Sequence, residues 1–249
     1  MNKSDRVYII STRSRDIVIS ESGDLLEDSY RGPAYFLERV FSKNFVPFDD
    51  ALCKSLEVEI LVTRDGEKGR VIKKPRQIRK TIDIKLAKWV VVSTVSDEWD
   101  LSSVDFHNSL VFLDIQGYVR DGDFFGRKKN WLAAEEVSKS IFCLKGTREE
   151  MRYIPKTVVE EQKKKMLIIT DGIFGVELFY NSQRYFVPSN VVEGLRDTIG
   201  AGDTFFAEYV SGLINNLEPE RALARAVNET SDFLSQKSSL GLVEGSKRV

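Results

Sequence analysis

The sequence has few of the residues that build metal sites and disulfide frameworks. Its 249 residues include one histidine, His107, and two cysteines. A lone histidine cannot build a metal site, which excludes zinc chemistry. Cys53 and Cys143 both lie in apolar segments. We expect two buried free thiols, and a disulfide between them is the alternative.

Long apolar runs and an excess of one charge are also lacking. No segment approaches the length of a membrane span, and the N-terminus has no apolar stretch of a signal peptide, so we expect a cytoplasmic protein without a membrane partner. Lys and Arg total 37 and Asp and Glu total 38. This balance gives no global reason to bind nucleic acid. The basic run at 68–80 has no aromatic residues for base stacking, so we expect no nucleic-acid partner.

Short apolar runs alternate with helical patterns along most of the chain. The runs that predict buried strands lie at 7–10, 89–92, 110–114, 141–144 and 166–170. The patterns that predict helices begin at Pro33, after Thr147, at about Ala201 and at Pro219. This alternation is typical of a doubly wound α/β fold, in which a mainly parallel sheet has helices on both faces.

Two stretches break that rhythm. Residues 57–80 alternate like antiparallel strands, and residues 16–20 form another short strand pattern before a turn. Together they predict a small β-lid over one edge of the main sheet, formed from parts of about 12–32 and 57–82. The alternative is a pair of solvated hairpins. We expect residues 1–249 to form a single domain with this lid.

The segment DTIGAGDTFF, residues 197–206, has the residues that phosphoryl transfer needs. Gly200 and Gly202 bracket Ala201 just before a predicted helix, so successive N–H groups can converge on an anion. Such a nest suits the charge that develops on a phosphoryl group. Asp203, in the first helical turn, can accept a proton from an attacking hydroxyl. The alternative is that Asp203 only caps the helix.

The ten residues together closely resemble the C-terminal signature of the ribokinase-like (PfkB) family of carbohydrate and nucleoside kinases. The resemblance implies a doubly wound α/β fold with a β-lid, ATP as the phosphoryl donor and Mg²⁺ as the metal. It also implies that the loop from Gly200 to Gly202 is the anion hole and that Asp203 is the catalytic base. The lid is in addition the predicted surface for a homodimer.

Other positions follow the family pattern with departures. Asp16 resembles the acidic residue that binds substrate hydroxyls, and Gly32 belongs to the family's diglycine segment, in which Arg31 replaces one glycine. Thr147 and Glu150 resemble the ends of the Asn-x-x-Glu motif that organises magnesium and phosphate, with Thr147 in place of Asn. Glu150 is therefore predicted to act on Mg²⁺ through water.

The nucleotide side is predicted from a second group of matches. The segment from Thr170 to Gly175 looks like the family's nucleotide-side loop. Asp197 and Ile199 lie at positions that in some members help hold a monovalent cation such as K⁺. The resemblance assigns nucleotide binding to Thr147, Thr170, Gly172, Gly175 and Thr198.

The segment DIQGYVR, residues 114–120, directly follows a predicted strand, at the carboxyl edge where α/β folds bind ligands. It resembles an element of the inositol-kinase-like members of the family. Asp114 and Gln116 are predicted to bind polyol hydroxyls and Arg120 to bind a phosphate. The alternative is an ordinary loop with a solvated Arg120.

Three hypotheses remain from the sequence. The first is an ATP-dependent kinase of a sugar or cyclic polyol, the second a nucleoside kinase of the same family, and the third a ligand-binding relative without catalysis. Asp203 and both glycines of the nest favour catalysis. Arg31, Thr147 and the short lid favour the third hypothesis. Asp16 and the lid, the least pattern-like part of the chain, are expected to set the substrate.

Overall fold

The computed structural model describes residues 6–63, 66–80, 82, 84, 87–106, 109–132, 135–192, 195 and 197–245; His107 lies outside them. Their main sheet has eight strands in the order β12-β11-β10-β9-β8-β7-β1-β4. These strands are β1 (Val7–Thr12), β4 (Phe48–Cys53), β7 (Trp89–Ser93), β8 (Leu110–Asp114), β9 (Ile141–Thr147), β10 (Met166–Thr170), β11 (Val176–Tyr180) and β12 (Gln183–Val187).

The five strands predicted from apolar runs are confirmed as β1, β7, β8, β9 and β10, which are parallel neighbours in the sheet. Their runs are almost continuously apolar because both faces of the sheet are covered. Strand β4 and the antiparallel hairpin of β11 and β12 were not predicted from the sequence. That hairpin turns at Asn181 and Ser182, which have φ of 49° and 63°. Two positive φ values in a two-residue turn match the right-handed twist of the strands they join.

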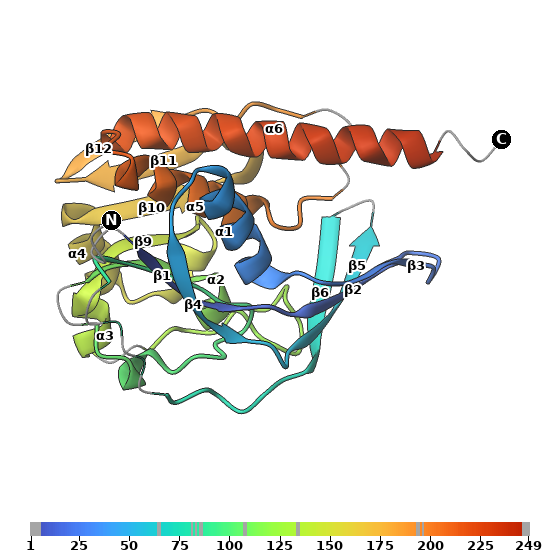
Figure 1. The fold of residues 1–249 in the computed structure, drawn as a ribbon, viewed down its shortest axis with the longest axis horizontal. Helices are drawn as coiled ribbons and strands as arrows, with labels where there is room; N and C mark the ends of the chain where they lie inside the picture. Colours follow the sequence, from blue (N-terminus) through green and yellow to red (C-terminus); the bar gives the residue numbers. More distant parts are fainter. Residues whose placement is uncertain are drawn as a thin grey trace.

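Helices cover both faces of the main sheet, as predicted. One face packs against α1 (Gly32–Lys43), α5 (Ala201–Ile214) and α6 (Pro219–Gly245). Figure 1 shows α6 as the long helix along one side of the molecule. The opposite face packs against the shorter α2 (Gln116–Val119), α3 (Glu135–Ser140) and α4 (Lys156–Lys164), with the 3₁₀ turns η2 (Leu101–Ser103), η3 (Glu150–Tyr153) and η4 (Gly172–Phe174) completing the described helical elements.

Neighbouring residues of one strand point to opposite faces, so Ile9 lies in the core beneath α1 and α5 while Ile10 lies in the other core. Cys53 and Cys143 are both buried and free, which confirms the predicted thiols. None of the described helices combines the length and apolar character that crossing a membrane requires.

A second sheet joins the two stretches that break the α/β rhythm. Its order is β3-β2-β5-β6, with β2 (Arg15–Ser20), β3 (Leu25–Tyr30), β5 (Glu57–Thr63) and β6 (Gly66–Lys73). Strands β2 and β5 are parallel, so segments about forty residues apart form one sheet rather than two solvated hairpins. Val18, Val58 and Ile60 are buried under it. This small sheet can serve as a lid.

The parallel strands bring their carboxyl ends to one edge of the main sheet. This edge is where α/β folds place their ligands. The residues at the ends of β1, β7, β8, β9 and β10 are Thr12, Ser93, Asp114, Thr147 and Thr170.

Candidate active site

A cavity of about 670 Å³ lies between the carboxyl edge of the main sheet, the lid sheet and the first turn of α5. Its volume is in the range of small-molecule sites. Most residues singled out from the sequence line it, namely Asp16, Gly32, Gln116, Arg120, Thr147, Glu150, Thr170, Gly172, Gly175, Thr198, Gly200, Ala201, Gly202 and Asp203. Asp114 and Asp197 do not belong to the lining.

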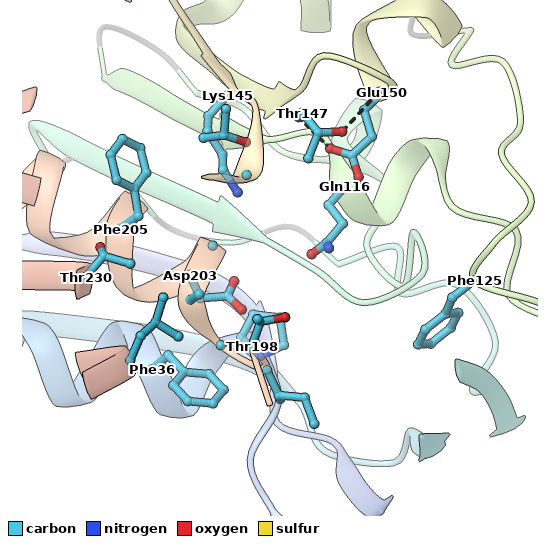
Figure 2. Close-up of a pocket in the computed structure, with 18 of the residues that line it drawn as sticks. Phe36, Gln116, Phe125, Lys145, Thr147, Glu150, Thr198, Asp203, Phe205 and Thr230 are labelled. Atoms are coloured by element: carbon cyan, nitrogen blue, oxygen red, sulfur yellow. Dashed lines mark hydrogen bonds between the residues drawn. The ribbon is translucent and has the colours of Figure 1, made fainter. Parts of the chain in front are cut away.

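Asp203 lies at the centre of the cavity, between Thr230 on one side and Phe125 on the other (Figure 2). The Ser93 hydroxyl, at the end of β7, donates a hydrogen bond of 2.9 Å to its carboxylate. This bond ties Asp203 to the main sheet, whereas a capping carboxylate would bond to amides of its own first turn. Burial and then the charge of Asp114 raise the pKa of Asp203 to about 6. A carboxylate with that pKa is ionised at neutral pH and well matched to accept a proton.

The glycine-rich loop forms the N-terminus of α5. Gly200, at the N-cap, has a φ of 82°. A Cβ there would lie 2.2 Å from the Phe36 ring, so only glycine fits. The Ala201 amide donates to the Thr198 carbonyl at 3.0 Å. The amides of Gly202 and Asp203 are then the first-turn donors without an intrahelical acceptor, and the helix dipole adds positive potential beside them.

Lys145 was not among the site residues predicted from the sequence. It lies in β9 with its ammonium 2.6 Å from the Asp114 carboxylate, and both side chains are almost fully buried. A Cβ on Gly202 would be 3.1 Å from the Lys145 ammonium, which places this charge directly beneath the nest. The charges of Asp114 and Asp203 raise the pKa of Lys145 despite its burial. A lysine at the end of the apolar run IFCL was the available signal.

Asp114 therefore does not lie where the sequence predicted, among the residues that bind polyol hydroxyls. Its side chain is only 1% exposed and lies behind Lys145 rather than on the cavity wall. Besides its contact with Lys145, the carboxylate accepts a 3.1 Å hydrogen bond from the backbone amide of Gln116. A buried carboxylate needs such partners, because an unpaired one would carry a large desolvation cost. Gln116 itself reaches the cavity (Figure 2).

Arg120 lies on the cavity wall and is not the solvated side chain of the alternative interpretation. Its guanidinium carbon is 4.2 Å from the centroid of the Phe125 ring, and one nitrogen donates to the Val95 carbonyl at 3.3 Å. Burial lowers the pKa of Arg120. Within the described part of the chain its Nε is buried without a hydrogen-bond partner. The Phe125 amide donates to the Gly69 carbonyl at 2.8 Å, which attaches this loop to the lid strand β6.

Asp16 marks the lid end of the cavity. Its carboxylate accepts hydrogen bonds from the Ser14 hydroxyl and from the Gly32 amide, the latter at 3.2 Å. Burial raises the pKa of Asp16. Gly32 has a φ of 63°, and a Cβ there would lie 2.6 Å from the Thr12 carbonyl oxygen. The Arg31 side chain forms an ion pair of 2.7 Å with Glu27.

Thr147 and Glu150 bond to each other across the start of η3 (Figure 2). The Thr147 amide donates to one Glu150 carboxylate oxygen at 2.8 Å, and the Glu150 amide donates to the Thr147 hydroxyl at 3.1 Å. The other carboxylate oxygen is 3.7 Å from the Lys128 ammonium. Among the described residues no group of three potential ligands could hold a metal by itself. Mg²⁺ at phosphates usually needs one or two carboxylates plus water, and Glu150 fits that requirement.

Asp197 lies behind the nest, and a lysine far along the chain contacts it. The Lys237 ammonium is 2.6 Å from one Asp197 carboxylate oxygen. The same ammonium donates to the Ile199 carbonyl at 3.0 Å. These are the two residues that the family resemblance assigns to a monovalent cation, so K⁺ does not fit here. No local pattern in the sequence points to Lys237.

The other end of the cavity is mainly apolar. Thr170, Gly172 and Gly175 line it together with residues from the loop after β12 and from α6. The apolar residues of this end are Ile173, Val176, Val191, Val192, Leu195, Val227 and Leu234.

Comparison with known sequences identifies a family for the C-terminal part of the chain. The model of the pfkB family carbohydrate kinases matches residues 133–241. A Mycoplasma genitalium protein, provisionally named a 1-phosphofructokinase, is 33% identical over 85 residues, which are 34% of this chain and 27% of that protein. The match therefore spans about a quarter of the relative's length.

Solved structures share the fold over most of their length. A pyrophosphate-dependent kinase in the ribokinase family, complexed with a pyrophosphate analog and myo-inositol, has a TM-score of 0.63 and 18% identity, with 92% of this chain and 94% of that chain covered. Arabidopsis thaliana ribokinase complexed with ribose and ATP has a TM-score of 0.67 and 14% identity, with 91% of each chain covered. The chain is thus similar to the pfkB family carbohydrate kinases over residues 133–241, and it has a ribokinase-like α/β fold with a small second sheet.

Proposed function

We propose that the chain transfers a phosphoryl group from ATP to a hydroxyl of a sugar or cyclic polyol, with Asp203 as general base. The observation that carries this proposal is the position of Asp203. A carboxylate with its pKa raised to about 6 lies in one cavity with the N-terminal amides of α5. A proton acceptor beside an anion-binding nest is the arrangement that phosphoryl transfer to a hydroxyl requires.

In the proposed reaction the acceptor hydroxyl gives its proton to an Asp203 carboxylate oxygen as its oxygen attacks the terminal phosphorus. The Gly202 and Asp203 amides and the Lys145 ammonium stabilise the negative charge on the transferred group. Bound Mg²⁺ would neutralise donor phosphate charge, and Glu150 would hold it through water. The Ser93 bond keeps the Asp203 carboxylate aimed at the cavity.

The choice of ATP over pyrophosphate rests on the apolar end of the cavity. Of the lining residues from Thr170 to Leu234, none of those described is a lysine or arginine. The cationic lining residues are Lys68, Arg120, Lys128 and Lys145. A bare pyrophosphate would need cations at its distal phosphate, whereas an adenine ring needs apolar contacts such as Ile173, Val191 and Leu234 supply.

The acceptor proposal rests on the lid end. Asp16 and Gln116 offer oxygen acceptors for vicinal hydroxyls, as a sugar or cyclic polyol requires. Lys68, Arg120 and Lys128 line the same end and favour a phosphorylated sugar as a second candidate acceptor. Val58 and Phe125 also line it, so a nucleoside remains the alternative to be tested.

The proposal includes the organisation of the chain as one kinase domain with the second sheet as its lid. Leu25, Leu26 and Tyr30 on β3 are more than half exposed. Apolar side chains gathered on an edge strand favour pairing with another copy. This supports the homodimer through the lid.

A substrate panel tests the proposal. Nucleoside diphosphate release with ATP and phosphate release with pyrophosphate would be measured across sugars, cyclic polyols, hexose monophosphates and nucleosides. We expect turnover with ATP and a polyhydroxylated ring. Highest kcat/KM for a nucleoside, or turnover with pyrophosphate alone, would contradict the proposed acceptor or donor.

Two neighbouring residues provide a matched test of the donor site. Ile173 and Phe174 are 69% and 70% exposed, but only Ile173 lines the cavity. Ile173→Asp should raise the KM for ATP because it places a carboxylate beside the adenine ring and the phosphates of ATP. Phe174→Asp should leave this KM unchanged. Equal effects of the two substitutions would refute the placement of ATP at this end.

A further inference from the structure

Lys237 connects the last helix to the loop that precedes the nest. It lies on α6, about forty residues beyond the loop, and its side chain is 16% exposed. Its ammonium contacts the Asp197 carboxylate at 2.6 Å and the Ile199 carbonyl at 3.0 Å. The remaining side of the ammonium lies 5.5 Å from the centroid of the Phe233 ring. A carboxylate, a carbonyl and an aromatic ring thus surround one cation.

These contacts hold the peptide group that begins the nest. The Ile199 carbonyl accepts from Lys237, while the Ile199 amide donates to the Asp197 carboxylate at 2.8 Å. In a trans peptide the C=O and the following N–H point in opposite directions. A cation on the Ile199 carbonyl therefore turns the Gly200 amide away from Lys237. The same cation offsets the negative charge of Asp197 close to where phosphate oxygens would bind.

We propose that the Lys237 ammonium takes the place of the monovalent cation that Asp197 and Ile199 would otherwise hold, so that this chain needs no K⁺. An ammonium and K⁺ carry the same charge and seek the same oxygen ligands. A second cation on the same oxygens would be repelled by Lys237 at close range. Lys237 is a positioning residue, since it acts through the loop and not on a substrate.

Packing supports a fixed position for this lysine. The Phe233 and Phe36 rings meet edge to face with centroids 6.0 Å apart. Phe36 is the residue against which Gly200 packs. Phe233 of helix α6 and the left-handed Gly200 therefore pack against the same side chain, Phe36. The ion pair of Lys237 with Asp197 adds a second contact between α6 and this loop. An ordinary surface ion pair would not reach a backbone carbonyl next to the anion hole.

The test uses salts at constant ionic strength and three variants. Lys237→Ala removes the charge, keeps a good helix former and leaves space for an ion. Lys237→Met removes the charge but fills the space. Lys43→Ala is the matched control, because Lys43 pairs with Glu229 on the same helix but lies away from the nest. KCl and ammonium chloride are compared with choline chloride, whose cation is too large for the site.

The changes in turnover that this inference predicts rest on the proposed kinase function. Wild type and Lys43→Ala should turn over equally in all three salts. In choline chloride Lys237→Ala should lose about 10–100-fold in kcat, the range for residues that orient a site from behind. KCl and ammonium chloride should restore it, whereas Lys237→Met should not recover. A potassium requirement in the wild type, or a loss in Lys237→Ala that neither salt restores, would overturn the proposal.

Thermal unfolding provides a readout that does not need activity. KCl should raise the Tm of Lys237→Ala above its value in choline chloride, with no such difference for wild type, Lys237→Met or Lys43→Ala. Because this shift does not depend on any substrate, it separates failure of this inference from failure of the kinase proposal. An equal Tm of Lys237→Ala in the two salts would refute replacement of a cation.

Discussion

The two ends of the cavity are built in different ways. The transfer end, defined by Asp203, Lys145 and the first turn of α5, lies on the ends of parallel strands in the eight-stranded sheet. The acceptor end, defined by Asp16, Gln116 and Arg120, lies under the four-stranded lid. In the proposed reaction, charges at the transfer end would act on the transferred phosphoryl group, which is the same for every acceptor. Groups at the acceptor end meet the part of the substrate that varies.

The two ends of the cavity also differ in how their charged groups are partnered. At the transfer end, each buried charge has a buried partner, as in the pair of Lys145 and Asp114. Removing one member of such a pair is costly because the other remains unpaired. At the acceptor end Asp16 and Arg120 line a cavity that a ligand would fill, and among the described residues the buried Arg120 Nε has no hydrogen-bond partner. We expect substitutions at the transfer end to lower kcat and those at the acceptor end to raise KM for the acceptor.

The largest effect is expected from Asp203→Asn. Loss of the general base should lower kcat by about 10²–10⁴-fold. ATP affinity should persist, because the nest amides remain. The folded protein holds the charged carboxylate at a cost, as its raised pKa shows, so the variant should unfold at an equal or higher temperature at pH 7.5. Steady-state kinetics and a nucleotide titration on the folded variant check this, and near-normal turnover would refute the role.

The two glycines of the nest should differ. Gly200→Ala forces a left-handed alanine against Phe36 and should cost about 1–2 kcal/mol of unfolding free energy from the backbone alone. It should also lower kcat by about 10²-fold, the size of losing an anion-hole donor. Gly202→Ala keeps a helical backbone and meets only the flexible end of Lys145. Denaturation and steady-state kinetics of both variants test this difference. A larger loss of stability and kcat in Gly202→Ala than in Gly200→Ala would contradict it.

At the acceptor end, Asp16→Ala should weaken binding of the acceptor by ~1.5–3 kcal/mol, which corresponds to roughly 10–150-fold in KM. ATP affinity should change little, because Asp16 lies at the lid end. Asp16→Asn is the control, since its amide oxygen can still accept from the Gly32 amide. If KM for the preferred acceptor is the same in Asp16→Ala and wild type, the carboxylate does not bind substrate.

The smallest of these effects concerns Glu150. Glu150→Gln retains an oxygen for the Thr147 amide but removes the charge. The Mg²⁺ concentration for half-maximal turnover should rise by about tenfold, within the range for residues that act on a metal indirectly. KM for the acceptor should stay constant. A magnesium titration decides, and an unchanged midpoint would remove Glu150 from the metal site.

The same contrast explains what the sequence could predict. The nest and Asp203 are contiguous, so a ten-residue segment with a helix behind it carried the prediction. The apolar runs of the parallel strands were equally local. The contacts of Lys145 with Asp114 and of Lys237 with Asp197 depend on how distant segments pack. The lid also depends on a long-range pairing of β2 with β5, and its alternation indicated strands but not their partners.

Asp114 illustrates the limit of a positional argument. Its place at the end of β8 was predicted, and the structure puts it there. Which way the carboxylate would turn depended on a buried lysine in the adjacent strand. The hairpin of β11 and β12 was also not predicted, because the turn that joins its strands could not be recognised from the sequence. Its strands flank a turn at Asn181 and Ser182, whose positive φ values are visible only in the structure.

The central claim is that Asp203 accepts the hydroxyl proton, and the pH dependence of kcat/KM tests it most directly. A base works only when ionised, so with its pKa raised to about 6 activity should fall as the pH drops through that value. The residual activity of Asp203→Asn, measured with the same ATP and Mg²⁺, should lack this acidic limb, which excludes titration of the donor as its cause. A limb that persists in Asp203→Asn, or a wild-type profile that stays flat below pH 6, would contradict the account.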